Sequence, residues 1–363
     1  MIPITKPYIT DTDIAAVTDV LKTGMLVQGE NVLALEKYVG EYLGNCHVAS
    51  VSNGTATMHL MLKINNIGKG DEVIVPAFSY VATANVVELV GATPIFVDIE
   101  LDTFNIDVSK IEEKINANTK AILAVHEFGL AANVEALKLI CDKHNVLFLE
   151  DAACALGAEY NGSKTGTFGQ SASFSLHPRK AITSGEGGLI VSKDAAYIEK
   201  CKVIRNHGVD PTKGHTGFTE AGFNYRMTDF QAALVLSQFK RFQFILDEKQ
   251  KIATTYLNEI NNPKLILPKV HEGYYHSWQS FHIILNGISQ AEAIAKLKEI
   301  GIGSNYGAQC IPQMDYYQNK YHLNSATMFP NAYNAWQNGL VIPLYPQLTQ
   351  QEIQHIINTL NQL

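Results

Sequence analysis

The stretch from residue 173 to residue 188 reads SFSLHPRKAITSGEGG and places one lysine, Lys180, in a loop between two apolar segments. The segment 172–174 precedes this loop, and the segment 189–191 follows its glycine cluster. An amine held in such a loop can be desolvated, which makes its neutral, nucleophilic form accessible. The stretch therefore predicts a Schiff-base lysine between two buried strands, whereas the alternative is a solvated surface lysine.

Short apolar runs alternate with helical stretches on the N-terminal side of this loop. Helices are predicted at residues 55–64, 80–89, 108–114 and 133–144. Strands are predicted at residues 47–51, 72–75, 93–97, 121–125, 146–149, 172–174 and 189–191. This alternation is typical of an α/β domain with a large, mostly parallel seven-stranded sheet. In such sheets ligands bind at the carboxyl ends of the strands.

The rest of the chain predicts an N-terminal arm and a smaller second unit. Two helices, at 12–22 and 32–43, come before the first strand, and one long helix is predicted at 228–257. After Pro263 and Pro268 we expect a strand at 280–285 and helices at 290–300 and 350–360. We therefore expect two domains: residues 1–240, with the arm and the large sheet, and residues 241–363, a small α/β domain.

Composition restricts the classes of function. The 363 residues include 28 Lys and Arg against 35 Asp and Glu, a net charge of −7, which does not indicate a nucleic-acid-binding face. The five cysteines show no metal-binding spacing, so a reducing compartment without structural zinc or disulfides is expected. There is no signal-peptide pattern and no apolar stretch long enough to cross a membrane. We therefore expect a cytoplasmic protein that binds neither nucleic acid nor membrane.

A candidate phosphate site follows the first predicted strand. The residues SNGTAT at 52–57 lead from this strand into a helix. Gly54 lets backbone N–H groups approach an anion, Thr55 adds a hydroxyl, and the N-terminus of a helix favours negative charge. The alternative is a strand-to-helix turn of small residues that binds nothing.

A second candidate site lies at the end of the strand predicted at 146–149, where two acids, Glu150 and Asp151, are adjacent. A carboxylate in a low-dielectric setting needs a cationic partner to stay ionised, and a protonated pyridine nitrogen is one such partner. The alternative is that Asp151 caps the following turn. Taken with Gly54, Thr55 and Lys180, this acid matches the needs of pyridoxal 5′-phosphate: a ring nitrogen, a phosphate and an aldehyde.

These residues also belong to a series of motifs that runs along nearly the whole chain. In this series the chain resembles the DegT/DnrJ/EryC1/StrS group of sugar aminotransferases, which use pyridoxal phosphate and have the fold called type I. The motifs are SNGT at 52–55, PAFSYVAT at 76–83, FVDI at 96–99, EDAA at 150–153, FSLHPRK at 174–180 with GEGG at 185–188, and GFNYRM at 222–227.

The resemblance implies a role for each residue around the cofactor. Lys180 would bind the cofactor's aldehyde and then move the proton between substrate and cofactor. Asp151 would keep the ring nitrogen protonated. Ser175 would bind the phosphate together with Gly54 and Thr55. The aromatic ring of Tyr80 would stack on the cofactor, the alternative for this residue being a buried core tyrosine.

The resemblance further implies a homodimer whose subunits share their active sites. Asn224 matches the position that reaches the phosphate from the partner subunit. Arg226 is a candidate for binding the carboxylate of the amino donor, because its planar fork suits bidentate pairing; the alternative is a structural ion pair. His177 and Tyr306 are candidates for the substrate side of the site.

The chain departs from the family pattern after the EDAA motif. Many relatives carry glutamine, histidine or glutamate there, close to the cofactor's hydroxyl group, whereas this chain has Cys154. A thiol forms weaker hydrogen bonds than these side chains. The departure puts in doubt a contact from Cys154 to the ring hydroxyl, but not the cofactor itself.

The activity that the resemblance implies is the transfer of an amino group from L-glutamate to a nucleotide-linked keto sugar, with a 4-keto-6-deoxyhexose as the expected acceptor. One alternative is a sugar dehydrase on the same scaffold, but dehydrases of this group replace the lysine with histidine. A second alternative is a regulatory protein that binds the cofactor without turnover.

Overall fold

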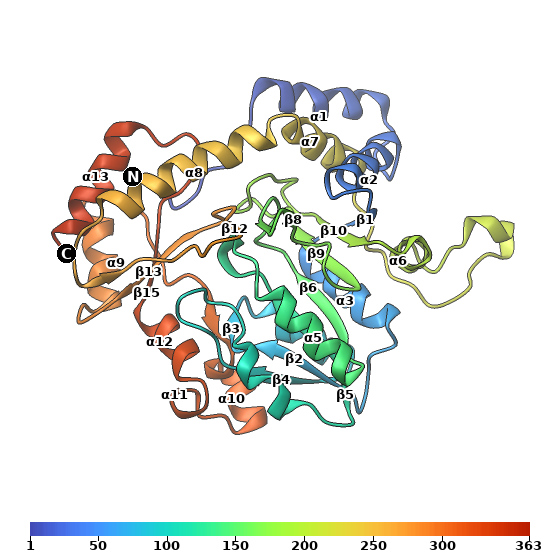
Figure 1. The fold of residues 1–363 in the computed structure, drawn as a ribbon. Helices are drawn as coiled ribbons and strands as arrows, with labels where there is room; N and C mark the ends of the chain where they lie inside the picture. Colours follow the sequence, from blue (N-terminus) through green and yellow to red (C-terminus); the bar gives the residue numbers. More distant parts are fainter.

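The computed structural model describes residues 1–363, the side chain of His215 excepted, and its centre is one seven-stranded sheet (Figure 1). The strands are parallel apart from β10, which runs antiparallel to both of its neighbours. Their order is β1 (His47–Val51), β10 (Gly188–Ser192), β9 (Ser171–Ser175), β6 (Leu147–Asp151), β5 (Thr119–Val125), β2 (Glu72–Pro76) and β4 (Thr93–Val97). The predicted large, mostly parallel sheet is confirmed.

Helices cover both faces of this sheet. Alternate residues of β10 show the division, because Ile190 packs into one apolar cluster while Leu189 and Val191 pack into another. The first face carries α3 (Gly54–Ile64), α4 (Ala82–Leu89) and α6 (Ala195–Arg205). The second carries α2 (Glu30–Tyr42), α5 (Val134–His144) and α7 (Asp229–Phe239). Covering on both faces accounts for the continuously apolar strands in the sequence.

Side-chain caps begin several helices at the ends of these strands. Asn53 accepts a hydrogen bond from the backbone N–H of Ala56 at 2.8 Å, which starts α3 directly after β1. Asn133 caps α5 in the same way, at 3.2 Å from the N–H of Ala136. Such caps satisfy N–H groups that have no partner within the helix. They fix the strand-to-helix turns at the carboxyl edge of the sheet.

The single helix predicted at 228–257 is wrong, because the structure has two helices, α7 and α8 (Phe242–Glu259). The helix is interrupted at Arg241, where φ is −120° and ψ is 18°. The Arg241 guanidinium donates to the carboxylate of Asp13 in α1 (Asp11–Thr23) and to the carbonyl of Tyr8 at 2.6 Å. Each helix can then pack its own apolar face. We propose that the domain boundary, after residue 240, lies at this break.

The helix predicted at 108–114 is also wrong in type. The structure has two short 3₁₀ turns, η1 (Val108–Lys110) and η2 (Glu112–Lys114). The Asp107 side chain accepts from the N–H of Ser109 and favours the tighter turn. Ile111, fully buried, is the apolar residue that anchors both turns.

The C-terminal part forms a second, smaller core. Its antiparallel sheet has the order β11 (Leu265–Ile266), β13 (Phe281–Leu285) and β15 (Gly339–Ile342). α8, α9 (Gln290–Glu299) and α13 (Gln350–Asn361) pack around it, and Ile2 joins this core through a bridge to Ile302. The predicted strand and two helices of this region are confirmed. Two further helices, α10 (Asp315–Tyr321) and α12 (Pro330–Asn338), pack instead against the large sheet's core.

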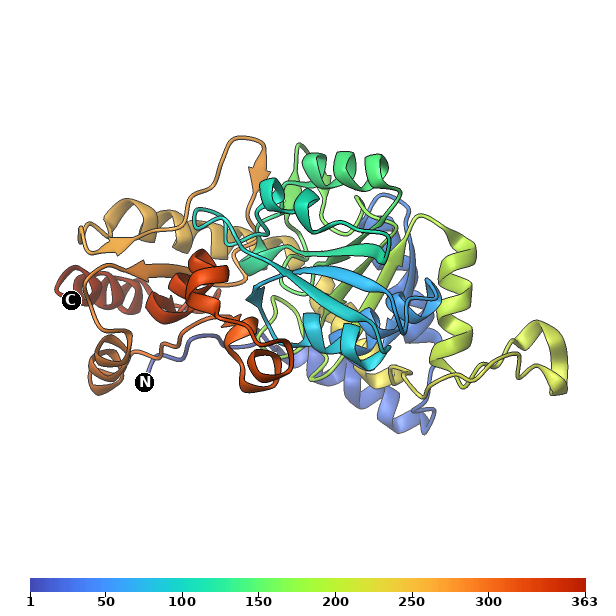
Figure 2. The ribbon, with the colours of Figure 1, turned by 90° about the horizontal axis from the view of Figure 1, so that it is seen from below.

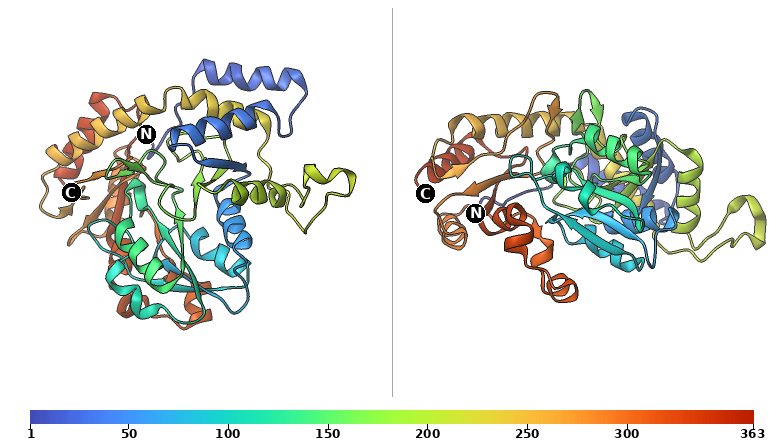
Figure 3. Two further views of the ribbon diagram at one scale, coloured as in Figure 1. Left: turned by 45° about the vertical axis from the view of Figure 1, so that its right-hand side comes forward. Right: turned by 60° about the horizontal axis from the view of Figure 1, so that its bottom comes forward.

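Short strands join the outer loops of the two parts. β3 (Phe78–Ser79) pairs with β14 (Gln309–Cys310), and β12 (Tyr274–Tyr275) pairs with β7 (Glu159–Tyr160), which pairs with β8 (Ser163–Lys164). The segment 206–224, which contains η4 (Pro211–Thr216), projects far from the rest of the chain (Figures 2 and 3). Among the helices that the structure describes, none combines the length and apolar character that a bilayer crossing demands.

Candidate active site

The loop that carries Lys180 joins β9 to β10 at the carboxyl edge of the sheet, as the sequence predicts. The Lys180 ammonium donates a hydrogen bond to the Sγ atom of Cys154 at 3.0 Å. Both residues line a small pocket together with Ser175. Ser277 and Gln279, from the segment before β13, close its other side. The cavity therefore lies between the large sheet and the C-terminal part, with the amine inside it.

Asp151 ends β6, three residues before Cys154, and has 3% of its surface exposed. Its carboxylate accepts hydrogen bonds from the Thr83 hydroxyl at 2.8 Å and from the backbone N–H of Ala153 at 3.1 Å. Burial raises the pKa of Asp151, while these two hydrogen bonds and the positive charge of Lys180 act in the opposite direction. A carboxyl group in this situation favours a cation beside it.

Gly54 and Ser175 come together at the N-terminus of α3. A side chain added at Gly54 would place its Cβ only 2.9 Å from the Cβ of Ser175 and 3.2 Å from its hydroxyl oxygen. The backbone of the first turn of α3, including Thr55, is thus brought close to the Ser175 hydroxyl without an intervening side chain. Free N–H groups at a helix N-terminus next to a hydroxyl suit a phosphate.

Gly54→Ala should weaken the binding of pyridoxal phosphate. The added methyl group must displace Ser175, and overpacking of this kind costs about 1–3 kcal/mol, so we expect the dissociation constant to rise about 10-fold or more. Equilibrium titration of the apoprotein measures this change. Gly68→Ala is the matched control, because the nearest atom to its added Cβ is at an ordinary 3.4 Å. Equal dissociation constants for both variants would contradict the assignment of this turn.

Tyr80 and Tyr306 are both exposed, by 56% and 41%. The core alternative for Tyr80 is therefore excluded. Tyr80 follows β3, and Tyr306 lies three residues before β14, the strand that pairs with β3. Gln309 also accepts a hydrogen bond from the N–H of Val81 at 3.2 Å. The structure thus places the two tyrosine segments beside each other.

The remaining residues predicted for the site are Asn224, Arg226 and His177. Asn224 is exposed at the base of the projecting segment. Among the side chains that the structure describes, Arg226 has no acidic partner within ion-pair distance, and its guanidinium donates to the Asn206 side-chain oxygen at 2.7 Å. Its backbone bridges to Val51, close to the turn that begins α3. His177 is half-buried, and burial followed by the charge of Arg179 lowers its pKa.

Two buried ionisable residues of the site were missed by the sequence analysis. Glu127, 4% exposed, lies in the turn after β5, and Lys249, also 4% exposed, lies in α8. The charge of Lys180 acts on both groups. Burial and this like charge lower the pKa of Lys249 to about 7. An acid at the end of a predicted sheet strand is the signal that identified Asp151. Glu127 stands after a sheet strand in the same way, so this signal could have found it.

The residues that the structure brings together fit pyridoxal 5′-phosphate. Lys180 lines a pocket, the carboxyl of Asp151 is buried within reach of the Lys180 charge, and Gly54 leaves a helix N-terminus open beside Ser175. Each corresponds to one part of the cofactor: the aldehyde, the ring nitrogen and the phosphate. No group of three or more His, Cys, Asp or Glu residues in the described part of the chain is arranged to hold a metal ion.

Comparison with known proteins gives the same assignment. The model of the DegT/DnrJ/EryC1/StrS aminotransferase family matches residues 7–361. GDP-perosamine synthase from Vibrio cholerae is 34% identical over 99% of this chain and 98% of its own length. Spr1654 from Streptococcus pneumoniae, solved in its PMP form, superposes with a TM-score of 0.94 at 28% identity, covering 99% of this chain and 97% of its own.

A second solved structure is PseC from Helicobacter pylori, an aminotransferase involved in the biosynthesis of pseudoaminic acid. Its TM-score is 0.93 at 30% identity, with 99% of this chain and 98% of PseC covered. The family match extends over almost the entire sequence, and Spr1654 has also been solved in its PLP form. The chain therefore belongs to the DegT/DnrJ/EryC1/StrS aminotransferase family and is a sugar aminotransferase that uses pyridoxal 5′-phosphate.

Proposed function

We propose that this aminotransferase transfers the amino group of L-glutamate to a nucleotide-linked 4-keto-6-deoxyhexose. The observation that carries the proposal is the position of the Lys180 amine, inside a cavity with Cys154 and Ser175 and close to the charge of Asp151. A lysine in this position argues against the dehydrase alternative. The pocket lies between the large sheet and the C-terminal part.

The side chains of the site have separate tasks in holding the cofactor. We assign the phosphate to the N-terminus of α3, with Gly54, Thr55 and Ser175, and the ring nitrogen to Asp151. Tyr80, exposed at this edge, would cover the ring. When bound, pyridoxal phosphate supplies an electron sink for the charge that develops as a C–H bond breaks. Thr83 and the N–H of Ala153 hold the Asp151 carboxylate in one orientation for this task.

Lys180 has two tasks in this proposal. Its amine would hold the cofactor covalently in the resting protein and, once released, would accept and return a proton at Nζ. The thiol of Cys154 is the group that the amine contacts in the structure, at 3.0 Å. Burial raises the pKa of this thiol, so it is held as a neutral group that leaves the proton transfer to Lys180.

The names of the relatives support the substrate class. The Vibrio cholerae protein is a GDP-perosamine synthase, and PseC takes part in pseudoaminic acid biosynthesis, so both belong to the formation of amino sugars. A cytoplasmic location is consistent with the five cysteines, all of which are free thiols in the structure.

The experiment that tests this function combines the holoprotein with L-glutamate and a panel of nucleotide-linked keto sugars. Release of 2-oxoglutarate and the mass of the sugar product are both measured. We expect stoichiometric 2-oxoglutarate and an aminated sugar with one 4-keto-6-deoxyhexose nucleotide. If 2-oxoglutarate forms but no sugar of the panel is aminated, the acceptor class is excluded. If no 2-oxoglutarate forms at all, glutamate is excluded as the donor.

We also propose that the active enzyme is a homodimer in which the projecting segment completes the partner's site. Asn224 is exposed at the base of this segment, while its own chain's Gly54 and Ser175 contact each other. Asn224 of a second copy of the chain would then supply an additional hydrogen-bond donor to the phosphate.

Mixed dimers test the shared site. We expect Lys180→Ala and Asn224→Ala homodimers each to be impaired, and a mixture of the two chains to regain activity. In a mixed dimer one of the two sites holds both native residues. The activity should therefore approach that of one native site per dimer. Turnover that stays at the average of the two homodimers after subunit exchange would show that each site is built from one chain.

A further inference from the structure

Asn206 is a half-buried residue at the end of α6 to which nothing so far assigns a task. Its backbone N–H donates to the carbonyl of Val203 at 3.1 Å, which ends the helix. Its side-chain oxygen accepts the hydrogen bond from the Arg226 guanidinium at 2.7 Å. The contact therefore joins the end of α6 to the residue that the sequence analysis names for the carboxylate of the amino donor.

Asn224 and Arg226 lie on one face of an extended segment. Side chains alternate between the two faces of such a segment. The rings of Phe223 and Tyr225 stack with their centroids 4.8 Å apart, and the Tyr225 hydroxyl lies 3.1 Å from Nδ1 of His59 on α3. Because these two rings face α3, Asn224 and Arg226 face the other way.

Asn206 shares the face of Asn224 and Arg226. It is paired with Asn224 in an antiparallel β-bridge, and residues directly opposite each other in such a pair point to the same side. The N–H of Tyr225 donates to the carbonyl of Arg205 at 2.9 Å, which keeps the two segments in this register. Arg226 is then the diagonal neighbour of Asn206, a position that a long side chain spans. The register of the backbone thus accounts for the contact between the two side chains.

A buried ion pair fixes the end of α6 that carries Asn206. The Arg205 guanidinium donates to the Glu36 carboxylate at 2.6 Å, and both residues are buried. The Ser50 hydroxyl donates to the same carboxylate at 2.9 Å. Glu36 belongs to α2 and Ser50 to β1, so two other elements hold α6 at this point. The position of Asn206, the next residue, is therefore set by buried contacts.

Asn206 orients Arg226 without neutralising its charge. An amide oxygen is uncharged, and here it accepts from only one of the several N–H groups of the guanidinium. Among the described side chains, no carboxylate lies within ion-pair distance of Arg226. The positive charge and the remaining N–H groups are left for a carboxylate from outside the chain, which a guanidinium binds through two parallel hydrogen bonds.

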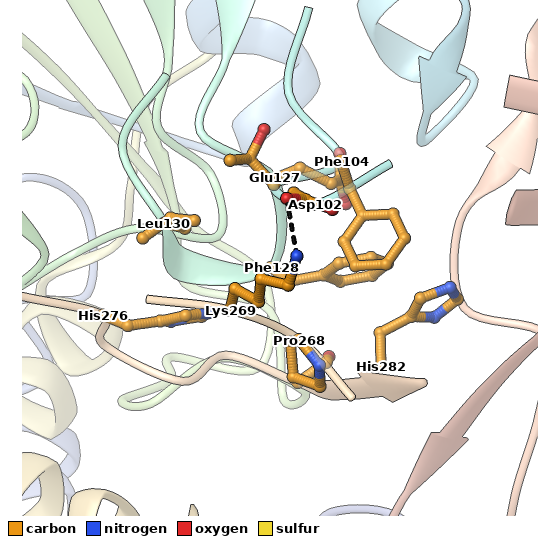
Figure 4. Close-up of a pocket in the computed structure, with 11 residues that line it drawn as sticks. Asp102, Phe104, Glu127, Phe128, Leu130, Pro268, Lys269, His276 and His282 are labelled. Carbon is orange, nitrogen blue, oxygen red and sulfur yellow. Dashed lines mark hydrogen bonds and ion pairs between the residues drawn. The ribbon is translucent and has the colours of Figure 1, made fainter. Parts of the chain in front are cut away.

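Lys269 shows the opposite arrangement at a second pocket. This lysine, Glu127 and His276 are among the residues that line the pocket (Figure 4). The Lys269 ammonium donates to the Asp102 carboxylate at 3.0 Å, so its charge already has an acidic partner within the chain. Arg226, which is held by an amide instead, is better suited to bind an external anion.

We propose that Asn206 is a positioning residue that fixes the Arg226 guanidinium in the orientation that binds the carboxylate of the amino donor. The inference rests on the proposed function, with Arg226 as the residue that binds this carboxylate. Asn206 acts through Arg226 and does not contact the reacting atoms. Its oxygen must also be uncharged, because a carboxylate at position 206 would pair with Arg226 and compete with the donor.

The test follows the release of 2-oxoglutarate from L-glutamate in a single turnover of the holoprotein, without sugar. We expect the half-saturating glutamate concentration to rise about tenfold in Asn206→Ala and further in Asn206→Asp, with the limiting rate within about twofold of native. Asn258→Ala is the matched control, because this asparagine is exposed on α8. A purely structural role would instead predict that aspartate, which keeps the oxygen, restores native binding.

Two results would overturn the proposal. One is an Asn206→Asp protein that binds glutamate as well as the native protein does. The other is a loss that falls on the limiting rate and leaves the half-saturating concentration unchanged. If Asn206→Ala does not fold, Asn206→Asp, which has nearly the same size, decides by the first criterion.

The variant Arg226→Ala separates this inference from the proposed function. The double variant Asn206→Ala/Arg226→Ala should bind glutamate no more weakly than Arg226→Ala alone, because Asn206 acts through Arg226. If Arg226→Ala weakens glutamate binding and Asn206→Ala does not, only the role of Asn206 fails. If Arg226→Ala has no effect, the assignment of Arg226 fails as well. If the native protein reacts with a different amino acid, the proposed donor is wrong, and that amino acid, which has the same α-carboxylate, replaces L-glutamate in the test.

Discussion

Replacing Lys180 by alanine should leave the fold intact and abolish transamination. In the function proposed above, the lysine contributes both the covalent attachment of the cofactor and the proton transfer, and general acid–base catalysis alone accounts for about 10²–10⁴-fold in rate. We therefore expect turnover to fall by at least about 10⁴-fold. The side chain lines a pocket and its ammonium donates to Cys154, so its loss removes no core packing. Circular dichroism and steady-state turnover measure the two outcomes.

Lys200→Ala is the matched control for this variant. Lys200 is an exposed lysine on α6, and the same truncation there should leave turnover unchanged. Near-normal turnover of Lys180→Ala, with cofactor present, would mean that another amine carries the reaction.

Asp151→Asn should produce the second-largest effect, with activity and stability changing in opposite directions. Asparagine keeps an oxygen for Thr83 but loses the charge that we propose for the ring nitrogen. Removing one partner of a buried charge pair costs about 3–5 kcal/mol, so kcat/KM should fall at least about a hundredfold. The unfolding free energy of the apoprotein should not fall, because a buried carboxylate without a cationic partner is itself unfavourable.

The pH dependence of apoprotein stability has a defined sign at this site. Burial raises the pKa of Asp151 above its ordinary value of 3.8, so just above that pH the native protein binds more protons than the unfolded chain. The unfolding free energy contributed by this group therefore falls as the pH rises through the raised pKa. Asp151→Asn should lack this decrease, while Asp142→Asn, at an exposed position on α5, should retain it. Parallel curves for native protein and Asp151→Asn would contradict a buried acid.

Much of the sheet and the cofactor site could be predicted from the sequence. Apolar runs such as Ile190 and its neighbours are buried on both faces, so strands are visible without an alternating pattern. Asp151 ends one of these strands, and Gly54 and Lys180 follow others within a few residues, so the carboxyl edge of the sheet brings the three positions together. The local sequence was therefore sufficient to predict the large sheet and the main candidate residues of the site.

The features that were missed depend on contacts between distant residues. The break between α7 and α8 occurs where Arg241 bonds to Asp13, a residue 228 positions away that no local pattern connects to it. Lys249 reads as part of the polar face of a helix, and only the packing of α8 against the C-terminal part buries it beside Lys180.

The most direct test of the central claim is to identify which lysine holds the cofactor. The holoprotein is reduced with borohydride, digested, and its labelled peptide identified by mass spectrometry. Lys249 is the alternative amine, since it is buried near Lys180 and burial lowers its pKa to about 7, within the nucleophilic range. The structure predicts one cofactor per chain on Lys180 alone. A label on Lys249, or no labelled lysine at all, would contradict the assignment of Lys180 and the function derived from it.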